Sequence, residues 1–122
     1  MPFQYILREL LSNNEDAIGA LFLDESGEAV DLAYSDLTPY QMRVVGAYLG
    51  IYLRQLESLA AANHLGEPQM MHIAKETLHI YAVPVDEGYC VALIQRNPAL
   101  VGLARRHLLT ARSKLRQALF ES

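Results

Sequence analysis

The sequence predicts a three-layer α/β/α domain, and three observations support this fold class. Two blocks of strand-like sequence flank one long helical run between Thr38 and about Asn63. The central strands are apolar on both faces, so the sheet has to be covered on both sides. Two amphipathic helices, one at each end of the chain, supply a second covering layer. We expect a single domain over residues 1–122, because a chain of this length buries one core.

The first third of the chain is expected to form a helix and a β-hairpin. Apolar residues recur at helical spacing from Phe3 to Leu11. The run Ala17–Leu23 is apolar throughout and indicates a central strand, whereas Glu28–Tyr34 alternates and indicates an edge strand. The residues Asp24-Glu25-Ser26-Gly27 form a tight turn in which glycine supplies a positive φ angle.

The long helix carries start and stop signals. Thr38 is a helix cap, Pro39 suits the first helical position, and Gln41 completes a capping box. Gly66 and Pro68 mark the end, since glycine takes the left-handed conformation and proline cannot continue a helix. The helix is therefore the best defined element of the sequence.

Three strands and a last helix follow. The strands are expected at Gln69–Lys75, Leu78–Val85 and Tyr89–Gln95, with linkers short enough for hairpins. Asn97-Pro98 caps a helix that runs to about Leu119. The predicted order is α-β-β-α-β-β-β-α. It describes a five-stranded, mainly antiparallel sheet with the long helix on one face and the terminal helices on the other.

The long helix carries more apolar surface than one sheet can bury. One stripe consists of Met42, Val45, Leu49, Tyr52, Leu56 and Leu59; a second consists of Val44, Tyr48 and Ile51, with Gly46, Ala47 and Gly50 between them. At roughly 36 Å the helix also exceeds the span of an eight-residue strand, about 26 Å. We therefore expect a dimer to bury the surplus. The Gly46-x-x-x-Gly50 spacing fits close packing either on a second helix or on the chain's own sheet.

The charge pattern argues against nucleic-acid or membrane partners. Carboxylates crowd the first third of the chain and basic residues the last third, so the two ends are expected to neutralise each other. The basic helix lacks interleaved aromatic residues for base stacking. No apolar run is long enough for a membrane span, and no signal peptide is recognisable, which predicts a cytoplasmic protein.

No motif for catalysis, cofactor binding or metal binding is found. Phosphate-binding glycine loops and nucleophile elbows are missing, and the Asp24-Glu25 carboxylates with Glu28 are better explained by a solvated turn. Cys90 lies in an apolar run, which favours a packed thiol over a nucleophile. The four histidines have no metal-site spacing, although His72 and His79 lie on neighbouring strands. We expect no enzymatic activity, no cofactor and no metal.

The element order, together with two segments, resembles the Roadblock family of dynein-light-chain-like domains. The first segment is the hairpin 19–31, with Asp24-Glu25-Ser26-Gly27 followed by Ala29-Val30-Asp31. The second is the closing helix 100–115, with Gly102-Leu103-Ala104-Arg105 near its start. The likeness covers nearly the whole chain.

The resemblance implies a homodimer and a GTPase partner. Roadblock domains typically join the strand after the long helix edge to edge, with the two long helices side by side. The implied dimer interface consists of Val44, Ala47, Tyr48, Gly50, Ile51, Met70, His72 and Ala74. Members similar to gliding-motility proteins bind small Ras-like GTPases and regulate their nucleotide state. Arg43 and Arg54 on the long helix are the residues expected to reach that partner.

Two alternative functions remain open at the level of sequence. A small-molecule sensor needs a cavity with convergent polar groups, for which His79, Tyr81 and Tyr89 are the available strand residues. A structural subunit of a larger assembly differs from a GTPase platform only in whether binding depends on nucleotide.

Overall fold

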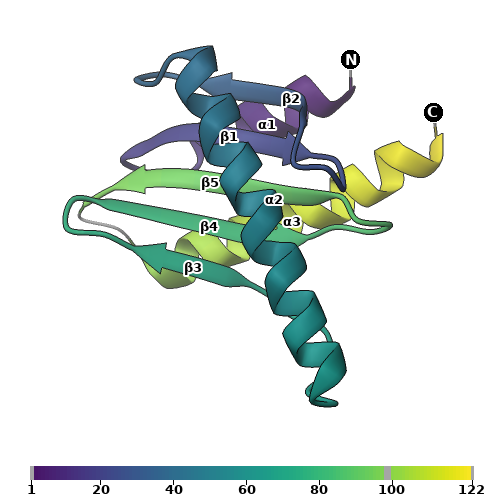
Figure 1. Cartoon of the computed structure of the whole chain (residues 1–122). Coiled ribbons are helices and arrows are strands. Elements are labelled where there is room, and N and C mark those ends of the chain that lie inside the picture. The colour runs from purple at the N-terminus through teal and green to yellow at the C-terminus, as the bar shows by residue number, and fades with distance from the viewer. Residues whose placement is uncertain (1, 98–99, 122) are drawn as a thin grey trace.

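The computed structural model describes residues 2–97 and 100–121, and within them the elements follow the predicted order (Figure 1). The helices are α1 (Pro2–Ser12), α2 (Pro39–Ala62) and α3 (Val101–Glu121). The strands are β1 (Ala17–Leu23), β2 (Ala29–Tyr34), β3 (Met71–Ala74), β4 (Leu78–Pro84) and β5 (Cys90–Arg96). The predicted fold class is confirmed, and β3 is shorter than expected.

The five strands form one sheet in the order β2-β1-β5-β4-β3, with every neighbouring pair antiparallel. The apolar strands β1 and β5 lie side by side at the centre, with Leu21 opposite Ala92. β2 and β3 are the two edges, which confirms the edge predicted for the second strand.

Each face of the sheet has its own apolar core. On one face, α1 and α3 cover a cluster that includes Leu7, Phe22, Leu93 and Leu108. On the other face, α2 covers a cluster that includes Leu21, Met42 and Ile94. Figure 1 shows α2 running across the strands and its last turns projecting past the β3 edge. The predicted overshoot of the long helix is therefore observed.

The cap at the start of α2 and the turn at Gly27 are confirmed. The Thr38 side chain accepts a hydrogen bond from the Gln41 backbone N–H at 3.1 Å, and the Gln41 side chain accepts one from Thr38 N–H at 2.9 Å. Gly27 and Gly66 have φ angles of 81° and 84°, which only glycine adopts without strain. The start of α2 thus follows from its predicted signals, but the residue that takes the left-handed conformation just past its end is His64, with a φ angle of 54°, and Gly66 comes two residues later.

Two glycines set α2 directly on the β1–β2 turn. A Cβ atom at Gly50 would lie 2.8 Å from the Gly27 Cα, and one at Gly46 would lie 2.7 Å from Leu23 Cδ2. The Gly46-x-x-x-Gly50 spacing therefore serves packing on the chain's own hairpin. Gly50 is buried there and cannot line a dimer seam, so its expected place in the interface is corrected.

The stripe predicted to be buried on α2 is correct only in part. The buried residues are Met42, Gly46, Leu49, Gly50 and Leu53. Val45 is half-buried, but Tyr52, Leu56 and Leu59 are exposed. The glycine contact rotates Gly50 and Leu53 toward the sheet, and the helix then leaves the sheet, so later apolar residues have nothing to pack on.

The start of α3 also differs from the prediction. Pro98 lies outside the described residues, and α3 begins at Val101, with Ala104 N–H donating to the Leu100 carbonyl at 2.9 Å. Asn97 is not a helix cap. Its side-chain amide instead donates to the Glu76 carbonyl at 2.7 Å, which ties the end of β5 to the β3–β4 turn.

We predict that Gly50→Ala lowers the free energy of unfolding by about 1–3 kcal/mol, because the new methyl group meets the Gly27 backbone rather than a flexible side chain. Urea unfolding at one fixed protein concentration measures this. Gly102→Ala in α3 is the matched control, since nothing lies within 4 Å of a Cβ there. The control should leave stability unchanged or raise it by up to about 1 kcal/mol. Equal effects of the two substitutions would contradict the close contact.

Candidate functional site

The outer side of α2 presents a row of exposed large apolar side chains. Its members, here called the exposed stripe, are Val44, Tyr48, Ile51, Tyr52, Leu56 and Leu59. Tyr48 is 56% exposed and Leu59 is 58% exposed. The rings of Tyr48 and Tyr52 lie 6.3 Å apart. A concentration of exposed apolar side chains on one helix face is typical of an interaction surface.

The β3 strand beside this helix is an open sheet edge. Lys75 N–H donates to the Leu78 carbonyl at 2.8 Å, so this pair is hydrogen-bonded. Hydrogen-bonded and non-bonded pairs alternate in an antiparallel ladder. The backbone N–H and C=O groups of Ile73 therefore point toward β4, whereas those of His72 and Ala74 point outward, away from the sheet. No hydrogen bond to these outward backbone groups is found in the part of the chain that the structure describes. β3 is therefore ready to pair with another strand.

The opposite edge, β2, is blocked by side chains of its own chain. The Gln4 side-chain amide donates to the Leu32 carbonyl at 3.0 Å and to Asp31 Oδ1 at 2.7 Å. Asp31 Oδ1 in turn accepts from Leu32 N–H at 2.9 Å. Leu32 lies at a non-bonded position opposite Leu21, so these are its outward groups. This arrangement disfavours strand addition at β2 and leaves β3 as the accessible edge.

The predicted interface residues fall into two groups, on α2 and on the β3 edge, whose side chains lie on opposite faces of the sheet, and two of them are covered. Val44, Ala47, Tyr48 and Ile51 are exposed on α2, and His72 and Ala74 are exposed on β3. Gly50 is covered by the β1–β2 turn, as described above. Met70 precedes β3 and packs, half-buried, against the core under α1 and α3.

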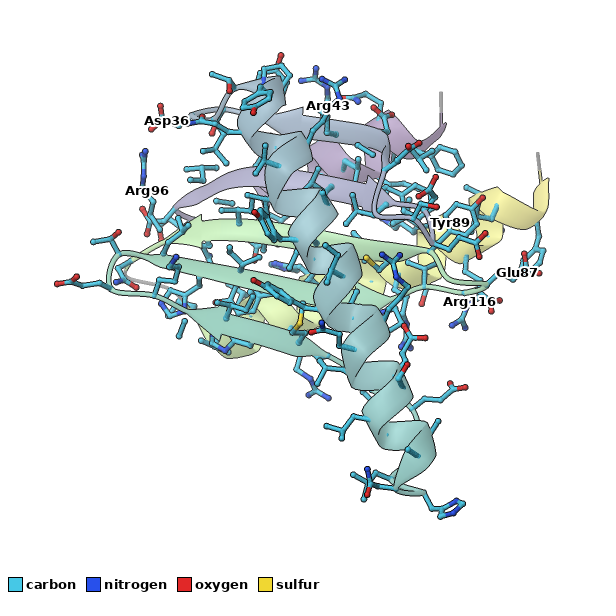
Figure 2. All side chains as sticks on the ribbon, in the orientation of Figure 1. Asp36, Arg43, Glu87, Tyr89, Arg96 and Arg116 are labelled. Carbon is cyan, nitrogen blue, oxygen red and sulfur yellow. The ribbon has the colours of Figure 1, made fainter. Side chains whose placement is uncertain are left out.

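The two arginines predicted to contact a partner lie on one side of α2. Their separation along the helix corresponds to about three turns and roughly 16 Å. Arg43 is exposed on the helix where it crosses the β2 side of the sheet (Figure 2). Arg54 donates from Nη1 to the Glu25 backbone carbonyl in the β1–β2 turn. Arg54 thus has a structural contact as well as an exposed surface.

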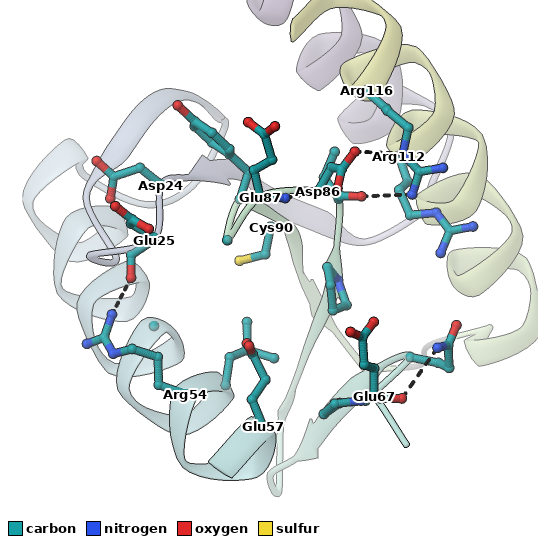
Figure 3. Close-up of a pocket in the computed structure, with 18 residues that line it drawn as sticks. Asp24, Glu25, Arg54, Glu57, Glu67, Asp86, Glu87, Cys90, Arg112 and Arg116 are labelled. Atoms are coloured by element: carbon teal, nitrogen blue, oxygen red, sulfur yellow. Dashed lines mark hydrogen bonds and ion pairs between the residues drawn. The ribbon is translucent and has the colours of Figure 1, made fainter. Parts of the chain in front are cut away.

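A polar cavity of about 330 Å³ lies between α2, the β1–β2 turn and the β4–β5 turn (Figure 3). Its charged lining consists of Asp24, Glu25, Glu57, Glu67, Asp86, Glu87, Arg54, Arg112 and Arg116. Asp24 Oδ1 accepts from two backbone N–H groups of its own turn at 2.9 and 3.0 Å. The predicted role of this carboxylate in a turn is confirmed. Within the described residues, no group of three or more potential ligands is placed to hold a metal ion.

Cys90 lines the same cavity but is not a reactive thiol. Its side chain is buried and unpaired with any other cysteine. Burial, together with the negative charge of Glu57, raises the pKa of the thiol to about 12. The thiolate needed for nucleophilic chemistry is therefore not formed near neutral pH.

The residues proposed for a small-molecule sensor do not converge. His79 and Tyr81 are neighbours on β4, with ring centroids 6.2 Å apart. Tyr89 lies at the far end of the same face and stacks on Phe22 at 5.4 Å. The buried pair formed by Val83 and Val91 lies between the two sites. The structure thus offers no shared pocket for this set.

A chain of polar side chains reaches the β3 edge. Asn97 Oδ1 lies 2.6 Å from His79 Nε2, and His79 Nδ1 lies 2.9 Å from His72 Nε2. The His72 ring stacks on Tyr81 with centroids 4.6 Å apart. Burial and the charge of His79 lower the pKa of His72. The two histidines on neighbouring strands therefore do converge. The contact of Asn97 with His79 was not predicted, because Asn-Pro in the sequence indicates the start of a helix.

Ion pairs confirm that acidic and basic segments neutralise each other. Arg96 pairs with Asp36 at one side of the molecule (Figure 2), and Lys114 pairs with Glu9. Such exposed pairs contribute little to stability. They do remove two basic groups from the surface that an anionic partner would need.

Comparison with known proteins establishes the fold. No family model and no curated protein matches the sequence. A Roadblock/LC7 domain from Streptomyces avermitilis superimposes with a TM-score of 0.88 at 13% identity, over 95% of this chain and 96% of that one. The gliding protein MglB from Thermus thermophilus gives 0.88 at 18% identity, over 99% and 90%. MglC from Myxococcus xanthus gives 0.71 at 20% identity, over 97% and 99%. The chain has the Roadblock/LC7 fold, as its sequence predicted.

Among the described residues, no helix has both the length and the apolar character required to cross a membrane.

We predict that His72 and His79 both carry their proton on Nε2 at neutral pH, because the Asn97 amide N–H₂ faces the Glu76 carbonyl and its oxygen faces His79. Nitrogen-15 NMR of the histidine rings identifies the tautomers. Titration in the same samples should place the pKa of His72 below the ordinary value of about 6.5. A proton on Nδ1 of His79 would contradict the chain of hydrogen bonds. In the Asn97→Ala variant, the preference of His79 for the tautomer protonated at Nε2 should weaken.

Proposed function

We propose that this protein is a non-catalytic homodimeric platform that binds a small Ras-like GTPase and regulates it. The observation that carries the dimer is the exposed stripe of α2 beside the open β3 edge. Burying a fully exposed large apolar side chain contributes about 1.5–3 kcal/mol. The residues of the exposed stripe are 37–58% exposed, so each can contribute a part of this on association.

The backbone directions of β3 restrict the geometry of such a dimer. Antiparallel pairing of two β3 edges joins residues whose N–H and C=O groups point outward, which are His72 and Ala74. Even-numbered residues therefore pair with even-numbered residues of the second copy. Since directly opposite residues place their side chains on the same face, equivalent residues of the two copies lie on one face of the joined sheet. The two α2 helices consequently lie on the same face. Each exposed stripe can then pack against the other.

The GTPase partner is supported by the fold and by the family resemblance. The chain shares its fold with gliding proteins MglB and MglC, and the Roadblock members that its sequence resembles bind small Ras-like GTPases. Arg43 and Arg54 are the proposed contacts. Arg43 is exposed and makes no ion pair among the described residues, so it is available to a carboxylate-rich partner.

We predict that Tyr48→Glu weakens the dimer at least about tenfold, because a carboxylate would be buried in the seam without a partner. Multi-angle light scattering across a dilution series measures the monomer–dimer equilibrium. Tyr5→Glu is the matched control, since Tyr5 is 68% exposed on α1 at the other face. A native protein that is monomeric at every micromolar concentration would overturn the dimer. Equal weakening by both substitutions would place the interface elsewhere.

The GTPase proposal is tested by affinity capture from lysate of the source organism, loaded with either a non-hydrolysable GTP analogue or GDP. Selective retention of a small GTPase in one nucleotide state is expected. The captured GTPase should bind Arg43→Glu and Arg54→Glu several-fold more weakly, because the charge of the contact is reversed. Arg106→Glu, an exposed site on α3, is the control. Retention that is independent of nucleotide would favour a structural subunit, and retention of no GTPase would overturn this part of the proposal.

A further inference from the structure

The open β3 edge carries a pair of imidazoles whose use the dimer alone does not explain. His72 is exposed on β3, His79 is half-buried on β4, and their facing nitrogens are 2.9 Å apart. Both side chains lie on the face of the sheet opposite α2, since His72 stacks on Tyr81 of the core under α1 and α3. The pair is therefore separate from the exposed stripe.

The hydrogen bonds fix which nitrogen of each ring has a free lone pair. Asn97 donates from Nδ2 to the Glu76 carbonyl, so its oxygen accepts from His79 Nε2–H. His79 Nδ1 is then an acceptor, and the N–H at His72 Nε2 donates a hydrogen bond to it. His72 Nδ1 keeps its lone pair, and no hydrogen bond to this atom is found within residues 2–97 and 100–121. Imidazoles that ligate metals typically have their other N–H held in this way.

A second copy would bring a second such nitrogen close to the first. The outward-facing backbone of His72 places both His72 side chains on the same face of paired β3 edges. Directly opposite residues have Cβ atoms about 4.5–5.5 Å apart, and diagonal neighbours are about 7–8 Å apart. Either register allows two imidazoles to reach one metal ion, which each nitrogen binds at about 2.0–2.1 Å.

We propose that the paired β3 edges form a binding site for one divalent transition-metal ion of the zinc type per dimer. Nδ1 of His72 from each copy supplies the protein ligands, and water completes the coordination. His79 and Asn97 orient the ligating ring without touching the metal. This inference rests on the homodimer of the proposed function.

The chemistry of the site selects the class of metal. Imidazole nitrogen suits Zn²⁺, Co²⁺, Ni²⁺ and Cu²⁺, whereas Mg²⁺ and Ca²⁺ prefer oxygen ligands. Within the described residues, one chain offers a single free imidazole nitrogen at this edge, Nδ1 of His72, and no group of three or more potential ligands that could hold the ion alone. The second copy is therefore part of the site.

The test uses untagged protein stripped of metal, titrated with ZnCl₂ in a calorimeter, with light scattering on the same samples. The expected stoichiometry is one Zn²⁺ per two chains, and MgCl₂ should give no signal. His72→Phe removes the ligating nitrogen but keeps a ring against Tyr81, so it should abolish this binding while leaving a folded dimer. His79→Phe should weaken it about 10–100-fold, because the supporting hydrogen bond is lost.

His64→Asn is the matched control, since His64 is exposed after the end of α2 and asparagine tolerates its φ angle of 54°, and this variant should bind Zn²⁺ like the native protein. A native dimer that binds no Zn²⁺, or a His72→Phe dimer that binds it equally well, would overturn the metal site and leave the dimer standing. A native protein that stays monomeric with and without Zn²⁺ would overturn both the dimer and the site.

Discussion

The contact between α2 and the β1–β2 turn is the constraint on which the rest of the structure depends. Gly46 and Gly50 let the helix backbone approach Gly27 and Leu23 more closely than any side chain permits. This contact fixes both the height and the rotation of α2 over the sheet. It directs Met42, Leu49 and Leu53 into the core and the exposed stripe outward. The apolar outer surface of the helix is thus a consequence of how its inner surface is held.

The two edges of the sheet differ in whether side chains of the chain itself hydrogen-bond to their outward backbone groups. Gln4 and Asp31 occupy the outward backbone groups of Leu32, so β2 is a poor template for strand addition. Among the described residues, no side chain hydrogen-bonds to the outward backbone groups of β3. The helix α2 crosses this strand and extends beyond it (Figure 1). An open edge and an apolar helix face therefore occur on the same side of the molecule. This combination is the physical basis of the proposed dimer, and the imidazole pair lies on the other face of that edge.

The sequence predicted what depends on local chemistry and missed what depends on tertiary contact. The capping box at Thr38, the turn at Gly27 and the apolar strands β1 and β5 are local patterns, and they were predicted correctly. The face of α2 that is buried was predicted only in part, because a glycine contact rather than hydrophobic spacing sets it. The hydrogen bond from the Gln4 side chain to the Leu32 carbonyl of β2 joins residues 28 positions apart, and no sequence pattern predicts it.

Hydrogen exchange at the β3 amides tests the central claim most directly. In an isolated chain, the inward amides of Met71 and Ile73 are protected by β4, while those of His72 and Ala74 exchange as open-edge groups. Pairing of two β3 edges adds partners to the outward groups, so we predict protection at all four positions, lost at the outward two on dilution to monomer. Fast exchange at His72 and Ala74 under conditions where the protein is dimeric would contradict the account.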